Sequence, residues 1–222
     1  MTRYLPFGII AAVLVIALLL VWFLVGSSRQ KGNQANNAVA NTVVPGAQPA
    51  HTRGEANAPV TLEEFGDFQC PSCGMFYRSL KQIESEYGPR LRVVFREFPL
   101  LPEHQQALVA AQAAEAAGLQ GHFWEMHDKL YETQAAWRNA KDPRQTIIGY
   151  AKEIGLDTDR FGRDMDGPVV ADRIFRDQNR GHALGVDATP SVFINGREVK
   201  GNSLSADGIR ETINQALKEA GP

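Results

Sequence analysis

The longest run of hydrophobic positions lies close to the N-terminus. Residues 7–25 are 19 consecutive uncharged and mostly aliphatic residues, and about 20 apolar residues cross a bilayer as a helix. A cleaved signal peptide is the alternative, but its apolar part usually has about 7 to 15 residues and ends at small residues. Leu24-Val25-Gly26 match such a cleavage site poorly. We therefore expect residues 1–26 to form an uncleaved membrane anchor, a single transmembrane helix.

The stretch that follows has neither hydrophobic periodicity nor an aromatic side chain. From residue 27 to about residue 55 the chain is rich in Ser, Asn, Gln, Ala, Gly and Pro, which is typical of a flexible linker. Residues 56–222 remain for a folded domain, and their number is large enough to bury a substantial core. Arg3 before the apolar run and Lys31 after it leave the membrane orientation open.

The folded domain begins with two different hydrophobic periods. Residues 58–65 alternate, with Glu64 on the same face as two aliphatic residues, which predicts a strand. Residues 75–87 have apolar side chains spaced by three and four, which predicts a helix, and residues 91–98 predict a second strand. A strand, a helix and a strand in this order form a βαβ unit with a parallel strand pair.

The middle of the domain is helical. Apolar spacing and alanine content predict helices at residues 103–117, 123–131, 144–154 and 167–182. Because no strand pattern interrupts them, residues 103–182 are expected to be a helical insertion. The charged residues 160–166 within it are interpreted as solvent-exposed surface.

Strand patterns return after the insertion. Residues 191–194 and 197–200 flank Asn195-Gly196, a pair typical of a tight hairpin turn. Residues 204–220 have apolar side chains spaced by four and predict a closing amphipathic helix. The predicted order is β-α-β, a helical block and β-β-α, which defines an α/β fold.

Charge and cysteine content narrow the function. The chain has 23 Lys+Arg and 25 Asp+Glu, and the part beyond residue 26 is slightly acidic with no long basic run, which argues against nucleic-acid binding. Its two cysteines exclude a small disulfide-framework protein. They are Cys70 and Cys73, and they lie between the first predicted strand and the following helix.

This position suits redox chemistry. At the start of a helix, residues i and i+3 share a face at a distance that a disulfide bridges, and the helix dipole stabilises the thiolate of Cys70. Pro71 suits a first helical turn because its missing N–H would be unpaired there. The pair Cys70 and Cys73 can then alternate between dithiol and disulfide through a mixed disulfide.

Two other roles for the cysteines are weaker. A structural disulfide that closes so short a loop gains little chain entropy. A zinc site needs four ligands, but the chain has no second cysteine pair, and His122 and His127 are five residues apart instead of the four that share a helix face. We expect no metal. Phe68 and Phe76 flank the cysteines, and either a peptide-binding surface or core packing would explain them.

The run TLEEFGDFQCPSC, the later run ATPSVFINGREVKG and the helical block between them resemble the DsbA-like branch of the thioredoxin superfamily, the membrane-anchored or secreted disulfide oxidoreductases of bacteria. The resemblance covers residues 56–220. It implies a thioredoxin-like fold with an inserted helical domain, in agreement with the predicted order of elements. It also implies that the Cys70–Cys73 disulfide is the redox-active group and that no other cofactor is required.

Further site residues follow from this resemblance. Thr189-Pro190 matches an X-Pro bond that is cis in the family and exposes the preceding backbone to a substrate peptide; an ordinary trans proline is the alternative. Glu64 matches a buried acid that moves protons during exchange, against the alternative of a solvated strand residue. Ser72 stands where the best-known member has histidine, and its hydroxyl is a weaker donor to a thiolate. The strength of the oxidant is therefore open.

The resemblance implies that the enzyme oxidises exported cysteine-containing proteins and is reoxidised by a quinone-linked membrane partner. It places the catalytic domain on the extracytoplasmic side of the cell membrane, in the periplasm or at the cell surface. Two alternatives remain. A reductase or isomerase kept reduced by a membrane electron donor is compatible with Thr189, and a thiol-based chaperone or metallochaperone would use the cysteines without catalysis.

Overall fold

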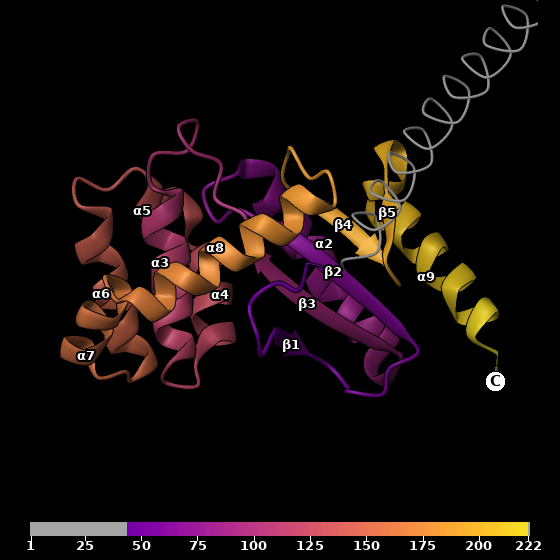
Figure 1. Cartoon of the computed structure of the whole chain (residues 1–222), viewed down its shortest axis with the longest axis horizontal. Helices are drawn as coiled ribbons and strands as arrows, with labels where there is room; N and C mark the ends of the chain where they lie inside the picture. Colours follow the sequence, from indigo (N-terminus) through magenta and orange to yellow (C-terminus); the bar gives the residue numbers. More distant parts are fainter. Residues whose placement is uncertain (1–43, 222) are drawn as a thin grey trace, which may run out of the picture. The chain divides into compact units, whose positions relative to one another are not determined.

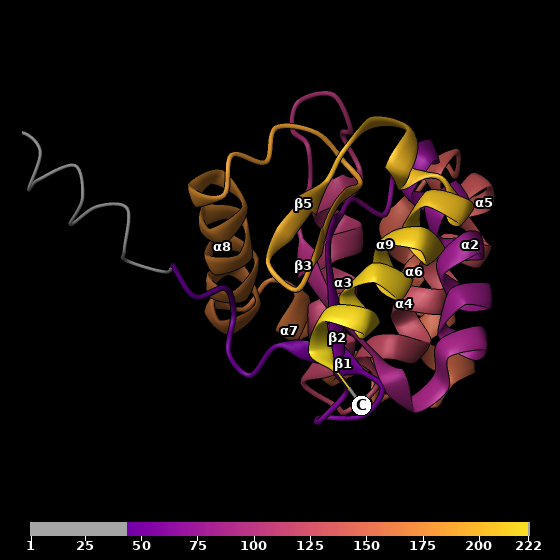
Figure 2. The same ribbon diagram turned by 90° about the vertical axis from the view of Figure 1, so that its right-hand side faces the viewer.

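The structure, a computed structural model, describes residues 44–221. The predicted anchor and the first part of the predicted linker lie outside the described residues. Within residues 44–221, no helix combines the length and the hydrophobicity needed to cross a bilayer. The described chain forms a central sheet with helices packed against both faces (Figure 1, Figure 2).

The sheet has five strands in the order β1-β3-β2-β4-β5. Its strands are β1 (His51–Arg53), β2 (Val60–Gly66), β3 (Leu91–Glu97), β4 (Ser191–Ile194) and β5 (Arg197–Val199). Among the strands of residues 44–221, only β2 and β3 pair in parallel, and α2 (Pro71–Tyr87) connects them, which confirms the predicted βαβ unit. A short 3-10 turn, η1 (Gly88–Arg90), leads from α2 into β3.

The hairpin between β4 and β5 turns at the predicted pair. Asn195 has φ 48° and Gly196 has φ 78°, the two positive angles that a type I′ turn requires. The Asn195 side chain also accepts a hydrogen bond from the backbone N–H of Thr61 at 2.8 Å. The turn is thereby attached to β2, the central strand.

Helices α2 and α9 (Ala206–Ala220) cover one face of the sheet. A short 3-10 turn, η2 (Gly201–Leu204), precedes α9. The side chains that the sequence placed on the inner faces of these elements are buried together, among them Val60, Leu62, Leu80, Ile83, Val93, Ile194, Ile209 and Ile213. Each such aliphatic side chain contributes about 1.5–3 kcal/mol when fully buried, so this core fixes the strand from which the cysteine turn leaves.

The helical insertion contains more helices than predicted. Its members are α3 (Ala107–Gly118), α4 (Phe123–Glu132), α5 (Gln134–Arg138), α6 (Pro143–Ile154) and α7 (Thr158–Met165). The charged side chains of residues 160–166 lie at the surface, exposed or half-buried, as interpreted, while α7 buries Phe161 and Met165 between them completely. The small alanine side chains of α3 are almost all buried, which allows α4, α6 and α7 to pack closely around it.

Helix α8 (Pro168–Ala183) returns from the insertion and crosses the second face of the sheet (Figure 1). It encloses a small core of Phe65, Phe98, Val186 and Phe193. A Cβ atom at Gly181 would lie 2.5 Å from the Phe98 ring. Glycine at this position therefore permits the close approach of α8 to the aromatic side chains beneath it.

The boundary between the linker and the domain differs from the prediction. Residues 44–53 belong to the domain, because β1 pairs with β3 and Ala47 is completely buried. Arginine side chains bind the carbonyl oxygens of this segment, as Arg180 does at Val44 (3.0 Å) and Arg96 at Ala47 (2.9 Å). These contacts depend on residues distant in sequence and leave no periodic pattern in the segment itself.

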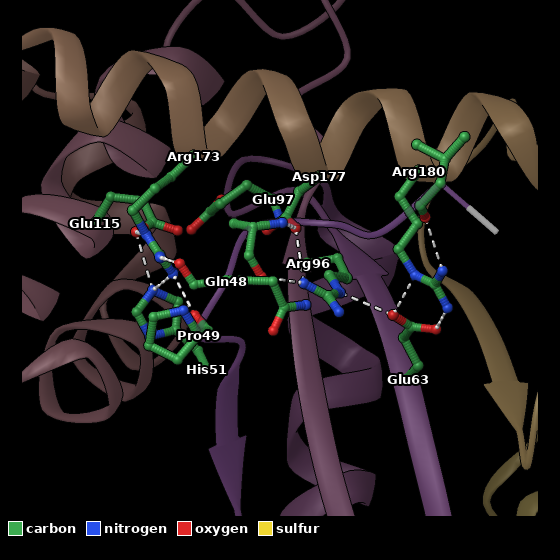
Figure 3. A network of polar contacts seen from close by, with 12 residues as sticks. Gln48, Pro49, His51, Glu63, Arg96, Glu97, Glu115, Arg173, Asp177 and Arg180 are labelled. Carbon is green, nitrogen blue, oxygen red and sulfur yellow. Dashed lines mark hydrogen bonds and ion pairs between the residues drawn. The ribbon is translucent and has the colours of Figure 1, made fainter. Parts of the chain in front are cut away.

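A buried ion-pair network connects the sheet to α8 (Figure 3). Glu63 accepts hydrogen bonds from Arg96 (2.7 Å) and from two nitrogens of Arg180 (both 2.7 Å), and Arg96 also pairs with Asp177 at 2.9 Å. Burial alone would raise the pKa of Glu63, but the two arginines outweigh burial and lower it. Glu63 is therefore a charged structural anchor on the face of β2 opposite to Glu64.

Candidate active site

Cys70 is the N-cap residue of α2 and follows the turn at the end of β2. Pro71 occupies the first helical position, and the backbone N–H of Gly74 donates to the Cys70 carbonyl at 3.2 Å. Cys70 and Cys73 are both free thiols in the structure. The local sequence therefore places one sulfur at the positive end of a helix and the other one turn inside it, as the spacing predicts.

The environment of Cys70 stabilises its thiolate. Its pKa is lowered from 9.0 to about 5, first by a hydrogen bond from the Cys73 thiol, against the opposing effect of burial, and then by the side chain of Thr189 and the backbone N–H groups of Cys73 and Ser72. The Thr189 hydroxyl oxygen is buried and has no hydrogen-bond partner among the described residues, so the hydroxyl is free to donate to the Cys70 thiolate. Cys70 is thereby a good leaving group at neutral pH.

Cys73 has the opposite character. It is fully buried, and burial, the hydrogen bond to Cys70 and the charge of Glu64 together raise its pKa well above 9.0. Cys70 thus keeps 7% of its surface exposed and is ionised, whereas Cys73 is protonated and fully enclosed. This asymmetry makes Cys70 the better suited of the two sulfurs to exchange with an external thiol, with Cys73 as its enclosed partner.

The cis-proline loop closes the site on one side. The Thr189-Pro190 peptide bond is cis, as the resemblance implied, and the Cys70 sulfur lies 3.3 Å from the Thr189 carbonyl oxygen. A groove of about 410 Å³ begins at this loop and is lined by Ser72, Met75, Phe76, Ser79, Thr189, Pro190, Leu204, Ser205 and Ala206. Met75 is 63% exposed, so the groove offers an apolar surface next to the reactive sulfur.

Glu64 lies in the sheet beneath the cysteines. It is buried on the same face of β2 as Leu62, and one of its carboxyl oxygens has no hydrogen-bond partner among the described residues. Burial, followed by the charges of Glu84 and Cys70, raises the pKa of Glu64 to about 8. A carboxyl group of this pKa holds a proton at neutral pH and can release it during exchange.

Two residues that support the cysteine turn were not anticipated from the sequence. Asp67 accepts hydrogen bonds from the backbone N–H groups of Gln69 (2.7 Å) and Leu100 (2.9 Å) and contacts His104 at 2.7 Å. An aspartate two residues before a backbone donor is a recognised turn signal. Gln134, in α5, donates hydrogen bonds to the backbone of the turn, and no local sequence pattern predicts this contact.

The other flanking residues separate into core and surface. Phe68 is buried against Phe95 and Tyr131, which makes it a core residue, whereas Phe76 is mostly buried but also lines the groove. His127 is buried, and burial lowers its pKa to about 4. Within residues 44–221, no three His, Cys, Asp or Glu side chains are grouped as metal ligands.

Comparison with known proteins places this geometry in a family. A family model described as thioredoxin matches residues 47–215. A thioredoxin-like oxidoreductase from Silicibacter pomeroyi DSS-3 has 29% sequence identity and a TM-score of 0.66, over 78% of this chain and 94% of that chain. BdbD from Bacillus subtilis has 25% identity and a TM-score of 0.68, over 76% of this chain and 93% of that chain.

The curated relatives include much longer proteins. The Na(+)/H(+) antiporter NhaA 1 of Salinispora arenicola is 41% identical over 167 residues, which are 75% of this chain and 24% of the antiporter. The chain spans about a quarter of the length of the curated relatives it matches.

The fold, the cysteine turn and the solved structures agree on the class of protein, because all three define a thiol–disulfide oxidoreductase. The chain belongs to the thioredoxin family, in its DsbA-like branch. The similarity to oxidoreductases favours an enzyme over the non-enzymatic thiol-based chaperone.

Proposed function

We propose that the enzyme works as an oxidase of dithiols, with Cys70 and Cys73 as its catalytic residues. A substrate thiolate attacks the Cys70 sulfur of the enzyme disulfide, and the Cys70–Cys73 bond breaks as a mixed disulfide forms. Cys73 leaves with the electron pair and takes a proton from Glu64. The second substrate thiolate then attacks the substrate sulfur and releases the Cys70 thiolate, so two electrons pass from the substrate to the enzyme.

The low pKa of Cys70 is the observation that carries this direction. A stabilised thiolate lowers the free energy of the reduced enzyme relative to its disulfide, and such an enzyme tends to accept electrons. Here the pKa of Cys70 is about 5 although Ser72 replaces the family's histidine. The Cys73 thiol, the Thr189 side chain and the helix N-terminus supply the stabilisation in its place.

The groove beside Pro190 supports an extended peptide as substrate. Thr189 and Pro190 are half-buried and line the groove, where an extended chain can pair with the backbone, and Met75 and Phe76 provide apolar contact in the same groove. The recognised feature is then the peptide backbone near a cysteine, with little selection of neighbouring side chains. Unfolded exported proteins with free cysteines fit this description.

The proposed membrane attachment and location rest on residues 1–26 and on the resemblance. An apolar run of this length suits a single-pass anchor, and residues 27–43 would give the domain reach. We infer an extracytoplasmic domain, because an oxidising thiol pair persists in oxidising compartments. A quinone-linked membrane protein would reoxidise it, and no cofactor other than the cysteine pair takes part.

The decisive experiment measures the reduction potential of the Cys70–Cys73 pair against glutathione, together with the thiol state of the full chain in cells. An oxidising potential and a disulfide at rest are expected. A strongly reducing potential with free thiols at rest would overturn the oxidase and leave a reductase or isomerase, with which Thr189 is compatible. A membrane-impermeant thiol reagent, applied to intact cells after reduction of the disulfide, tests the location, since protection of the reduced Cys70 would contradict an extracytoplasmic domain.

A further inference from the structure

One side chain of the helical insertion binds the backbone of the cysteine turn. Gln134, the first residue of α5, donates its amide N–H groups to the carbonyl oxygens of Phe68 at 2.7 Å and Cys70 at 2.8 Å. These two carbonyls lie on either side of Gln69, in the turn between β2 and α2. A single side-chain amide therefore spans the turn that presents the reactive sulfur.

The chemistry of the two acceptors fixes the orientation of this amide. A carbonyl oxygen accepts hydrogen bonds and cannot donate them, so only the nitrogen of Gln134 can face both of them. The amide oxygen faces Gly74, in the first turn of α2, where an added Cβ atom would lie 2.8 Å from it. The glycine directly after Cys73 thus leaves the space that the Gln134 amide occupies.

Gln134 itself is held by the break between α4 and α5. Thr133 ends α4 with its backbone N–H and its hydroxyl both donating to the Lys129 carbonyl, at 3.0 and 2.7 Å. Trp137 is completely buried, and its indole N–H donates to the Leu130 carbonyl at 2.7 Å. The amide therefore reaches the cysteine turn from a rigid base and needs little further ordering.

We propose that Gln134 is a positioning residue, which holds the cysteine turn so that the N-terminus of α2 stays aimed at the Cys70 sulfur and so tunes the reactivity of that thiol. The Cys70 carbonyl accepts both Gln134 and the backbone N–H of Gly74. Its direction determines how the N–H groups of Ser72 and Cys73 face the Cys70 sulfur. The positive end of the amide dipole also points at the turn, which favours a nearby anion.

This proposal rests on the exchange chemistry of the site and holds for either direction of electron flow. The proposal also gives the helical insertion a chemical role, because α5 supplies a contact to the cysteine turn that neither the sheet nor α2 and α9 supply. Loss of the amide leaves the Phe68 and Cys70 carbonyls without this donor and loosens the turn. The thiolate of Cys70 then loses part of its stabilisation.

The first test replaces Gln134 by alanine in the full-length chain and compares it with Gln120→Ala. Gln120 is a matched control, because its amide also bonds to backbone of the insertion, donating to the Asp157 carbonyl (3.2 Å) and accepting from the Asp157 N–H (3.0 Å). Two readouts are needed, the pH dependence of Cys70 alkylation in the reduced protein and the equilibrium of the cysteine pair with glutathione. Neither is expected to change in Gln120→Ala.

In Gln134→Ala the alkylation midpoint should rise by about one pH unit, which is about a tenfold loss of thiolate at a pH below the midpoint. The glutathione equilibrium should move by a similar factor toward the enzyme disulfide, because the reduced form is less stabilised. A purely structural role for Gln134 would lower thermal stability and leave both readouts unchanged.

The second test displaces the same Gln134 amide by a substitution at Gly74, the residue that it contacts. In Gly74→Ala the new methyl group displaces the Gln134 amide, while alanine favours the helix more than glycine does. We expect the same upward shift of the Cys70 midpoint, with the helix preference of alanine offsetting part of the stability lost with the two hydrogen bonds of the amide. The shift should not increase further in the double variant Gln134→Ala/Gly74→Ala, because both substitutions remove one interaction.

If Gln134→Ala fails to fold, the proposal is tested with Gly74→Ala. Wild-type midpoints and glutathione equilibria in every variant that folds would overturn the proposal, as would two independent shifts that add fully in the double variant. A wild-type chain whose Cys70 does not exchange with glutathione at all would refute the exchange chemistry itself, and the role of Gln134 with it.

Discussion

The sulfur of Cys70 lies 3.3 Å from the carbonyl oxygen of Thr189, although 119 residues separate them in the sequence. The contact joins the N-terminus of α2 to the cis-proline loop. The thiol that reacts and the backbone available to a substrate therefore form one continuous surface. Both the thiolate chemistry and substrate placement depend on this junction.

Cys73→Ala should convert the enzyme into a trap for its substrates. The Cys70 thiolate can still attack a disulfide of an exported protein, which forms a mixed disulfide and releases one protein thiolate, but Cys73 is no longer there to attack that bond and free the protein. Non-reducing electrophoresis of cell extracts should show adducts that disappear on reduction. The double variant Cys70→Ala/Cys73→Ala is the control, and adducts that persist in it would contradict the assignment of Cys70.

Alkylation of the reduced enzyme should follow a single group with a midpoint near pH 5, the pKa of Cys70, while Cys73 stays unreactive at neutral pH. Thr189→Val should raise this midpoint, because it removes the hydroxyl but keeps the size of the side chain. Ser203→Ala, in the turn before α9, serves as the control. A midpoint close to 9 in the wild type would show that the thiolate is not stabilised.

The reduced enzyme should be more stable than the oxidised enzyme at pH 7. The pKa of Cys70 is lower in the folded state than in the unfolded chain, so its contribution to stability is fully present above about 9 and disappears as the pH falls through about 5. Thermal unfolding of both forms between pH 7 and pH 5 measures this difference, which should shrink on acidification. A more stable oxidised form at pH 7 would argue against a strong oxidant.

Glu64→Gln should stabilise the protein at neutral and alkaline pH and slow exchange. The folded state raises the pKa of Glu64 from 4.5 to about 8, so its contribution to stability is full below 4.5 and is lost as the pH rises through 8. The variant should gain on the order of 4 kcal/mol at pH 8 and nothing at pH 4. Denaturant unfolding at both values measures the gain, and a loss at pH 8 would contradict the burial of a titrating carboxyl.

Glu63→Gln should have the opposite effect on stability and leave the thiols unchanged. It leaves Arg96 and Arg180 without their shared buried carboxylate, and removal of one partner of a buried ion pair costs about 3 kcal/mol or more. Since the fold lowers the pKa of Glu63, the cost should be present above pH 4.5 and fade in acid. Glu86→Gln, in an exposed pair with Arg210, should change denaturant stability little.

Local sequence patterns predict the elements with long periods or specific turns. The alternation around Leu62 locates β2, and Asn195-Gly196 locates the hairpin. Strand β1 has only three residues and is held at the sheet edge by β3, so it has no pattern of its own. Helix α5, of five residues, was missed because it is too short to show a helical period.

The residues of the candidate site likewise divide into those that the local sequence predicts and those that it does not. Cys70, Cys73 and Pro71 are adjacent in sequence and follow from helix-start chemistry, while Glu64, Thr189 and Pro190 required the family resemblance. Gln134 could not be predicted, because its role depends on the packing of α5 against a turn 64 residues earlier. Glutamine has no periodicity or motif that announces such a contact.

The contacts of residues 44–49 determine how tension on the N-terminal side of the chain enters the domain. Three arginine side chains bind carbonyl oxygens of this segment before β1 begins (Figure 3): Arg180 at Val44, Arg96 at Ala47, and Arg173 at Gln48 and Pro49. A pulling force ahead of Val44 is therefore transferred to α8 and β3, and not to the turn that carries the cysteines. In the proposed anchored enzyme, a pull on the linker would therefore act on α8 and β3 before it reached the reactive bond.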